Sequence, residues 1–154
     1  MSVFLDTSVI LAGLIDFGPH SAPAQSLLHA IAERRLPDCS TAWHCCLEFF
    51  SVATRLPPEY RLTAADAARL LEEEVLARMA VHDLPATARE PMIKAAAHDA
   101  MTGGRIYDVH IAEVARAVKA ETIVTDNRRH FVAALRYGMR VETPAEFLAG
   151  MKRK

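Results

Sequence analysis

Short apolar runs typical of strands alternate with helical patterns along the whole of this 154-residue chain. The runs that predict strands are Val3–Leu5, Asp38–Ser40, Val81–Leu84, Thr122–Thr125 and Met139–Glu142. Between them, apolar residues recur at helical spacing, and proline, glycine and capping residues mark the ends of the helices. Strands separated by helices are typical of a parallel sheet with helices on both faces. We therefore expect an α/β fold.

The helical patterns can be bounded from the sequence. Helices are expected over Ser8–Ile15, Ala24–Arg34, Ala42–Arg55, Ala64–Val75, Ala88–Met101, Arg105–Ala120, Arg128–Arg136 and Pro144–Met151. Ser8 is suited to cap the first helix, and Thr63-Ala-Ala-Asp66 resembles a capping box. The chain shows no internal repeat or linker, and its length suits one domain that buries roughly two-thirds of its unfolded surface. We expect a single domain over residues 1–154.

Composition and cysteine usage favour a globular protein of the cytoplasm. Hydrophobic residues make up 51% of the chain and charged residues 24%, which is ordinary for such proteins. The apolar stretch Ser2–Phe17 is interrupted by Asp6 and is not preceded by Lys or Arg, unlike a signal peptide or a membrane span. Cys39, Cys45 and Cys46 lack metal-ligand spacing, and the adjacent pair is poorly placed for a disulfide. Reduced, mostly buried thiols and no membrane association are expected.

Two acidic residues follow strand-like runs that lie far apart in the sequence. Asp6 comes directly after Val3–Leu5, and Asp126 follows Thr122–Thr125. In open parallel sheets, ligands bind beyond the carboxyl ends of the strands, so both acids are expected in one crevice. Taken singly, each would also serve as a helix cap. Carboxylates gathered at such an edge suit Mg²⁺, which takes oxygen ligands and leaves positions for water and phosphate.

Two further acids fall within helical patterns. Asp108 shares a helical face with Ile111, Ala112 and Ala115, where an unpaired charge would be costly to bury. A ligand role for Asp108 is therefore favoured over a simple helix-start acid. For Glu48 the pattern supports a solvated face about as well as a site.

The net charge of −1 shows no basic excess of the kind that marks many nucleic-acid-binding domains. Two bound divalent cations would change that formal charge to +3, so an acidic metal site can conceal a surface that accepts phosphate. The basic cluster nearest to a candidate acid is Arg128-Arg129-His130.

The acids sit in four short motifs: Phe4–Leu11, Leu47–Phe49, Arg105–Ala112 and Val124–Phe131. Taken together and in this order, the motifs resemble those of PIN-domain ribonucleases, and most closely the VapC-type toxins of bacterial and archaeal toxin-antitoxin systems. The resemblance covers nearly the whole chain. Each motif is short, so its specificity comes from having all four within one domain of suitable length.

The resemblance implies a three-layer α/β/α fold with a central, mostly parallel sheet. It also implies an endoribonuclease that depends on Mg²⁺ or Mn²⁺, forms a homodimer and is inhibited by a cognate antitoxin protein. Carried over by motif, Asp6 and Asp108 are direct metal ligands. Glu48 and Asp126 complete the catalytic site directly or through water.

Neighbouring residues receive supporting roles. Orientation of carboxylates or water is assigned to Thr7, Ser8, Thr125 and Asn127, although a helix cap is the better interpretation of Ser8 and Asn127. Arg128 and Arg129 are candidates for contact with the RNA backbone. His110 and His130 receive no role, since this chemistry does not require an imidazole base.

Other classes of protein were weighed against this interpretation. A haloacid-dehalogenase-like phosphatase would need a second Asp two positions after Asp6, where Ser8 stands. A response-regulator receiver would need an Asp after its third strand and a late Lys, neither of which is convincingly placed. A PIN-like domain that binds RNA or a protein partner without catalysis remains an alternative, which the presence of all four acids disfavours.

Overall fold

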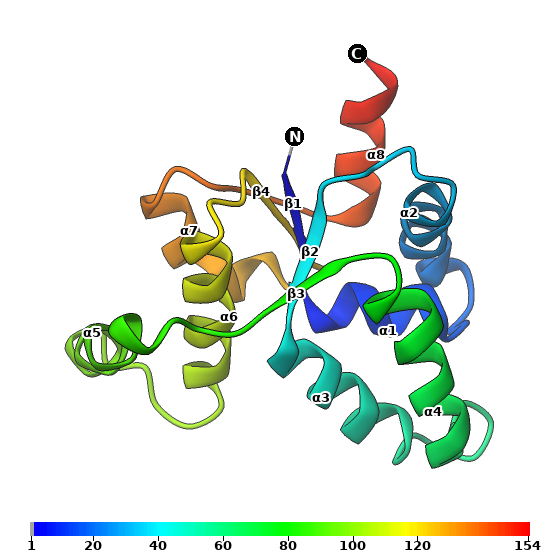
Figure 1. Ribbon diagram of the computed structural model, residues 1–154, viewed down its shortest axis with the longest axis horizontal. Helices are drawn as coiled ribbons and strands as arrows, with labels where there is room; N and C mark the ends of the chain where they lie inside the picture. The colour runs from blue at the N-terminus through cyan, green and yellow to red at the C-terminus, as the bar shows by residue number, and fades with distance from the viewer. Residues whose placement is uncertain (1) are drawn as a thin grey trace.

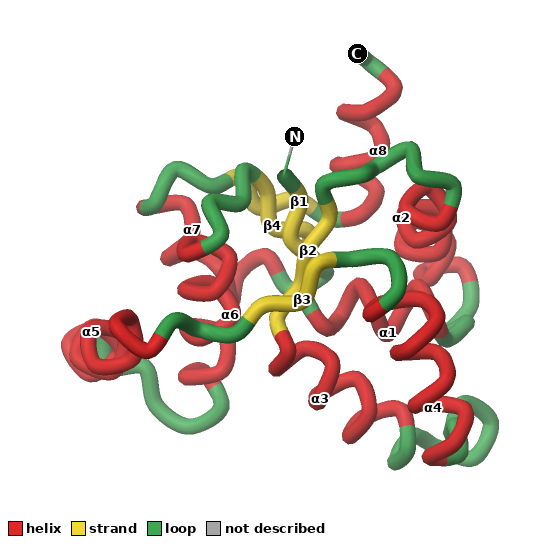
Figure 2. Tube along the Cα trace, in the orientation of Figure 1, coloured by secondary structure: helices red, strands yellow, loops and turns green. Residues whose placement is uncertain are grey.

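A computed structural model describes residues 2–154 and contains a five-stranded sheet in the order β3-β2-β1-β4-β5. The strands are β1 (Val3–Leu5), β2 (Cys39–Ala42), β3 (Ala80–His82), β4 (Thr122–Val124) and β5 (Arg140–Glu142). Every neighbouring pair in this sheet is parallel. All five strands coincide with expected runs to within a few residues. Figure 2 shows the sheet at the centre, with helices around it.

Helices cover both faces of the sheet, which confirms the three-layer α/β/α arrangement. One group comprises α1 (Thr7–Leu14), α2 (Ala22–Ala32), α3 (Trp43–Ala53), α4 (Ala64–Leu70) and α8 (Pro144–Lys152). The other comprises α5 (Ala86–His98), α6 (Arg105–Ala117) and α7 (Val132–Arg136). Figure 1 shows the two groups on opposite sides of the strands. Short helical turns are formed by η1 (Pro19–Ser21), η2 (Leu71–Leu76) and η3 (Arg128–Phe131).

The central strands β1 and β4 form the floor of the core. Their residues are buried throughout, as expected for parallel strands covered on both faces. The register pairs Leu5 with Val124, and the Asp6 amide donates a hydrogen bond to the Val124 carbonyl at 3.1 Å. The chain segments that leave β1 and β4 therefore start side by side.

Several helix boundaries differ from those expected. The pattern over Arg128–Arg136 forms a 3₁₀ turn followed by the short helix α7 rather than one helix. After α4, the helix widens into the π-helical segment η2. The structure offers no clear local reason for that widening.

The capping predictions had mixed outcomes. Ser8 as the cap of the first helix is wrong, because α1 begins at Thr7 and Asp6 occupies the cap position. The predicted cap at Thr63 is confirmed, since its hydroxyl accepts a hydrogen bond from the Asp66 amide at 3.1 Å. A full capping box at Thr143 and Glu146, which starts α8, was not predicted.

Expectations about cysteines and membranes can also be compared with the fold. Cys39, Cys45 and Cys46 are free and buried, as predicted. Burial, reinforced by the nearby Asp6 charge, raises the pKa of the Cys45 thiol to about 12, which keeps it protonated. Within residues 2–154, the longest and most apolar helices still fall short of what crossing a bilayer requires.

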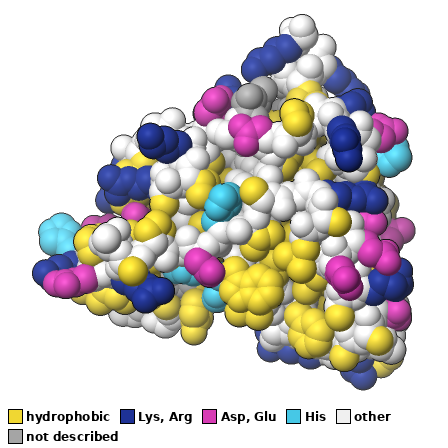
Figure 3. Space-filling model, in the orientation of Figure 1, with side chains coloured by type: hydrophobic (Ala, Val, Ile, Leu, Met, Phe, Trp, Pro, Cys, Tyr) yellow, Lys and Arg dark blue, Asp and Glu magenta, His cyan; other side chains and the backbone are white. Residues whose placement is uncertain are grey.

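The outer face of α3 carries large apolar side chains. Trp43, Leu47 and Phe50 are exposed at helical spacing, whereas Cys46 and Phe49 on the other side are buried. Figure 3 shows a cluster of hydrophobic side chains on the part of the surface where Figure 1 places α3. The core therefore takes up only one side of this helix.

Candidate active site

Asp6 lies at the junction between β1 and α1, at the carboxyl end of the strand and between the two helical layers. Its side chain is almost fully buried, with 5% of the residue surface exposed. One carboxylate oxygen, Oδ2, accepts hydrogen bonds from the Thr125 hydroxyl at 2.8 Å and the Ser8 hydroxyl at 2.9 Å. Burial raises the pKa of Asp6, while these two hydrogen bonds favour the ionised form and offset part of the rise. The position of the carboxylate is therefore fixed from two sides.

The same hydroxyl groups join the β1 and β4 ends of the site. The Asp126 amide donates to the Ser8 hydroxyl at 3.1 Å, and the Asn127 amide donates to the Thr125 hydroxyl at 3.0 Å. Asp126 itself is exposed at the edge of the crevice. This network holds together segments that lie more than a hundred residues apart.

Glu48 and Asp108 reach the site from helices on opposite sides of the sheet. Glu48 lies on α3 and Asp108 in the first turn of α6, and both are half-buried. Burial together with the charges of Asp6 and Asp108 raises the pKa of Glu48 to about 7. Burial is also the main cause that raises the pKa of Asp108 and of Asp126, and the Asp6 charge adds to both. Asp6 thus acts electrostatically on the other three acids, so the structure places all four in one neighbourhood.

Such a concentration of partly buried negative charge suits a cation. The Thr7 hydroxyl also suggests a cation site. The Thr7 hydroxyl oxygen is buried and makes no well-formed hydrogen bond within residues 2–154, although it lies near Glu48 and lowers the pKa of that carboxyl slightly. An unpaired buried oxygen beside carboxylates suits a site that a cation and its waters would complete.

The ligand set is not drawn together in advance. Among residues 2–154, no three acidic, histidine or cysteine side chains are close enough to one another to hold a metal ion. The donor chemistry fits Mg²⁺ or Mn²⁺, which take carboxylate oxygens. Binding would require the side chains to move inward around the ion.

Two histidines that the sequence left without a role contact the acids. His44 Nε2 lies 2.7 Å from Glu48 Oε1, without the alignment of a well-formed hydrogen bond. His130 Nδ1 lies 3.4 Å from Asp108 Oδ2. The spacing of four residues between His44 and Glu48 on a helix could have indicated the first contact. Nothing local in the sequence indicates the second.

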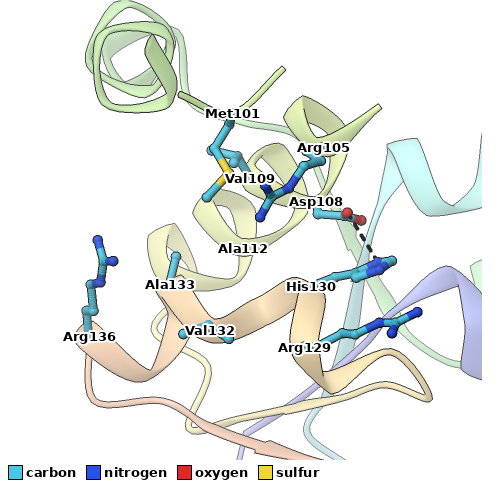
Figure 4. A pocket seen from close by; sticks show the side chains of 10 residues that line it. All are labelled: Met101, Arg105, Asp108, Val109, Ala112, Arg129, His130, Val132, Ala133 and Arg136. Atoms are coloured by element: carbon cyan, nitrogen blue, oxygen red, sulfur yellow. Dashed lines mark ion pairs between the residues drawn. The ribbon is translucent and has the colours of Figure 1, made fainter. Parts of the chain in front are cut away.

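The structure separates the two arginines that were grouped as candidates for RNA contact. Arg128 turns toward α8, where its Nη1 lies 2.8 Å from Glu146 Oε1. Arg129 lines a pocket beside Asp108, next to His130 (Figure 4). Asn127 precedes η3, but its side chain makes no capping hydrogen bond there.

Comparison with known proteins finds similarity over most of the chain. Residues 2–129 match the sequence model of the PIN domain family. The chain is 35% identical over 124 residues to ribonuclease VapC27 of Mycobacterium tuberculosis strain ATCC 25618 / H37Rv, a match that covers 80% of this chain and 84% of the relative.

Solved structures share the fold at lower identity. VapC20 of Mycobacterium tuberculosis, described as a sarcin-ricin loop cleaving toxin, superimposes with a TM-score of 0.60 and 20% identity over 79% of this chain and 87% of that one. VapBC2 from Rickettsia felis, solved with a DNA fragment from its promoter, gives a TM-score of 0.62 and 17% identity over 93% and 98% of the two chains. The fold, the family match and the identity to VapC27 show that this chain belongs to the PIN-domain family.

Proposed function

We propose that this protein is a metal-dependent endoribonuclease that acts as the toxin of a toxin-antitoxin pair. The observation that supports the proposal is that Glu48, Asp108 and Asp126 lie near enough to Asp6 for its charge to add to the rise in pKa that burial causes in each. The similarity to a relative named as a ribonuclease supports RNA as the substrate.

Asp6 and Asp108 would hold a Mg²⁺ or Mn²⁺ ion directly, with Glu48 and Asp126 completing the site directly or through water. When bound, such an ion makes a water molecule easier to deprotonate and offsets negative charge that develops on the phosphate. The pKa of Glu48 is about 7 in the metal-free protein. A bound cation would lower it and favour the ionised carboxylate.

The surrounding side chains fix this geometry. Ser8 and Thr125 hold one oxygen of Asp6 by hydrogen bonds at 2.9 and 2.8 Å, and the backbone of Thr7 and Ser8 also favours the ionised carboxylate. Thr7 contributes a buried hydroxyl near Glu48 that would orient a water. His130 Nδ1 lies 3.4 Å from Asp108 Oδ2, and this contact offsets part of the rise that burial causes in the pKa of Asp108.

The proposed partners follow from the relatives. RNA is the substrate, and a cognate antitoxin protein is the inhibitor, in line with the fold shared with VapBC2 from Rickettsia felis. We also propose a homodimer in the cytoplasm. Light scattering of the purified chain, with a mass twice that of one chain expected, checks the dimer.

One observation favours a second candidate function. Because no three donor side chains of residues 2–154 stand close enough to hold an ion as they are, a PIN domain that binds RNA or protein without cleaving would show the same arrangement. The two candidates differ in whether RNA is cut.

Induction of the chain without a partner in bacterial cells tests the choice. Growth and total RNA are compared for the parent chain, Asp6→Asn and Asp108→Asn at matched soluble expression. Asp38→Asn serves as the control, because it makes the same chemical change just before β2, at the opposite end of the strands from Asp6. Growth arrest with discrete RNA fragments is expected for the parent and Asp38→Asn and should be absent from the two site variants. Intact RNA in all four strains would favour the binding module.

A further inference from the structure

A pocket of about 290 Å³ opens beside Asp108, between α6 and the η3–α7 segment. Residues of its wall include Arg105, Asp108, Val109, Ala112, Arg129 and His130. Figure 4 shows Asp108 and Arg105 projecting from α6 and His130 and Arg129 from the facing segment. The pocket therefore shares one of its walls with the acidic crevice.

The floor and the rim of this pocket differ in chemistry. Val109 and Ala112 belong to an apolar lining that Met101, Val132 and Ala133 extend. The guanidinium groups of Arg105 and Arg129 make no ion pair or hydrogen bond with any side chain of residues 2–154, whereas Arg136 at the far end lies 3.6 Å from Asp99. A pocket lined both by these two arginines and by apolar side chains suits a ligand that joins an anionic group to a flat apolar one.

The position of the two arginines relative to the acids restricts the ligand further. A lone anion would be repelled by four carboxylates, yet here two arginines adjoin Asp108, and the charge of Arg105 offsets part of the rise in the pKa of that acid. A chain of phosphates suits both the arginines and the acids, because one phosphate can bind the arginines while its neighbour binds a metal held by the acids. Arginine forks match phosphate oxygens bidentately.

The size of the pocket and the composition of the opposite side of the site also favour a nucleotide as the ligand. Its volume lies near the lower end of small-molecule sites, roughly 300–1,000 Å³, which suits one nucleotide better than a protein helix. A second hollow of about 510 Å³ borders Ser8 and Asp126 and is lined by no Lys or Arg. The basic side of the site is thus the Asp108 side.

We propose that this pocket binds the nucleotide next to the scissile bond, with its phosphate on Arg105 and Arg129 and its base over the apolar floor. This assignment rests on the proposed ribonuclease function and adds to it the side of the acidic crevice along which the RNA lies. Arg128, engaged with Glu146, lies outside the pocket.

Binding of RNA without cleavage tests the assignment. Asp6→Asn supplies a chain that leaves RNA intact, and Arg105→Ala, Arg129→Ala and Arg35→Ala are compared in that background. The probe is a short, fluorescein-labelled single-stranded RNA of mixed sequence, followed by anisotropy in Mg²⁺ at several salt concentrations. Arg35 is the matched control, because it is exposed and paired with Glu33 beyond the end of α2.

Each pocket variant should weaken RNA binding about tenfold, since it removes one charged contact with a phosphate. The slope of log affinity against log salt should fall by roughly 1 per arginine. Arg129→Lys should keep most of that slope while losing part of the affinity, because it retains the charge but not the fork. Arg35→Ala should bind as the parent does. Thermal unfolding confirms that each variant is folded.

RNA binding unchanged in both pocket variants would overturn the assignment, even if chains with intact acids cut RNA. Conversely, loss of RNA binding in these variants, combined with intact RNA when all four acids are present, would support the pocket as an RNA-binding site and reject the catalytic proposal. Binding of polyglutamate tests whether an acidic protein segment occupies the pocket. If the affinity for polyglutamate falls more in Arg105→Ala and Arg129→Ala than the affinity for RNA does, the RNA assignment is wrong.

Discussion

At the scale of single residues, the site is a set of carboxylates that are harder to ionise than they would be in water. Burial raises the pKa of Asp6, Asp108 and Asp126, and that of Glu48 reaches about 7. The folded, metal-free protein therefore holds protons here more tightly than the unfolded chain does. Protons and divalent cations compete for the same oxygens, which links stability, pH and metal.

The contribution of Glu48 to the stability of the metal-free protein should fall as pH rises, whereas His44 and His110, whose pKa burial lowers, contribute in the opposite direction. The pKa of Glu48 is raised from 4.5 to about 7 on folding. Its contribution to stability is therefore complete below the lower value and lost as pH passes the upper one. In EDTA we expect the midpoint of thermal unfolding of the parent chain to drop relative to that of Glu48→Gln between about pH 5 and about pH 8, and added Mg²⁺ to restore it mainly at the higher pH.

Glu48→Gln is the control for this effect. The glutamine side chain stays neutral at every pH, so the unfolding midpoint of this variant should drop less between the same two conditions. The other three acids keep part of the pH dependence. An equally steep drop in Glu48→Gln, with no gain from Mg²⁺ in the parent chain, would contradict the interpretation. Circular dichroism at matched ionic strength gives both midpoints.

Thr125→Val tests whether the hydroxyl network positions Asp6. The substitution keeps the side-chain shape but removes the donor that lies 2.8 Å from Asp6 Oδ2. Loss of a group that orients a metal ligand typically costs about 10- to 100-fold in metal affinity or activity. We expect the Mg²⁺ concentration for half-maximal RNA cleavage to rise by about that factor. Thr54→Val, which removes a hydroxyl from the end of α3, should leave it unchanged; equal effects would point to general destabilisation.

At the scale of elements, the five strands could be predicted because each is a short segment between helical patterns. The central strands β1 and β4 are apolar and buried throughout, whereas the edge strands β3 and β5 are partly exposed. Boundaries were less predictable where the helical pattern continues but the backbone changes form. Examples are η2 after α4 and the division between η3 and α7. Apolar spacing alone does not distinguish α from 3₁₀ or π geometry over a few residues.

Helix ends offer a stability test within this fold. Ala100 follows α5 with φ of 52°, and Gly138 follows α7 with φ of 78°. Each donates to a carbonyl three residues earlier, and the next amide bonds five residues back, which is a Schellman arrangement. Ala100→Gly should therefore raise the free energy of unfolding by about 0.5–1 kcal/mol, because glycine adopts positive φ without strain.

Gly138→Ala is the reciprocal change and should lower the free energy of unfolding by about 1 kcal/mol. A Cβ at Gly138 would meet no atom within 4 Å, so backbone strain is the only cost. Urea midpoints at an unchanged slope measure both effects. The same sign of change in both variants would contradict this account of the helix ends.

At the scale of the whole molecule, topology explains which site residues the sequence could place. The sheet order puts β2 and β4 on either side of β1, so successive connections diverge there, as at a ligand-binding switch point. That rule predicted the proximity of Asp6 and Asp126. Glu48 and Asp108 were placed by resemblance to the family motifs, since their helices approach the crevice through tertiary packing alone. The contacts of His130 and Arg129 with the Asp108 side required the structure.

Cleavage of total bacterial RNA by the purified chain, first in EDTA and then after addition of Mg²⁺ or Mn²⁺, is the most direct test that the four acids form a metal-dependent catalytic centre. Asp108→Asn and Asp38→Asn are run in parallel. Discrete fragments should appear in the parent and Asp38→Asn only after metal is added, and never in a folded Asp108→Asn chain. Equal cleavage in EDTA, or by Asp108→Asn, would contradict the central claim.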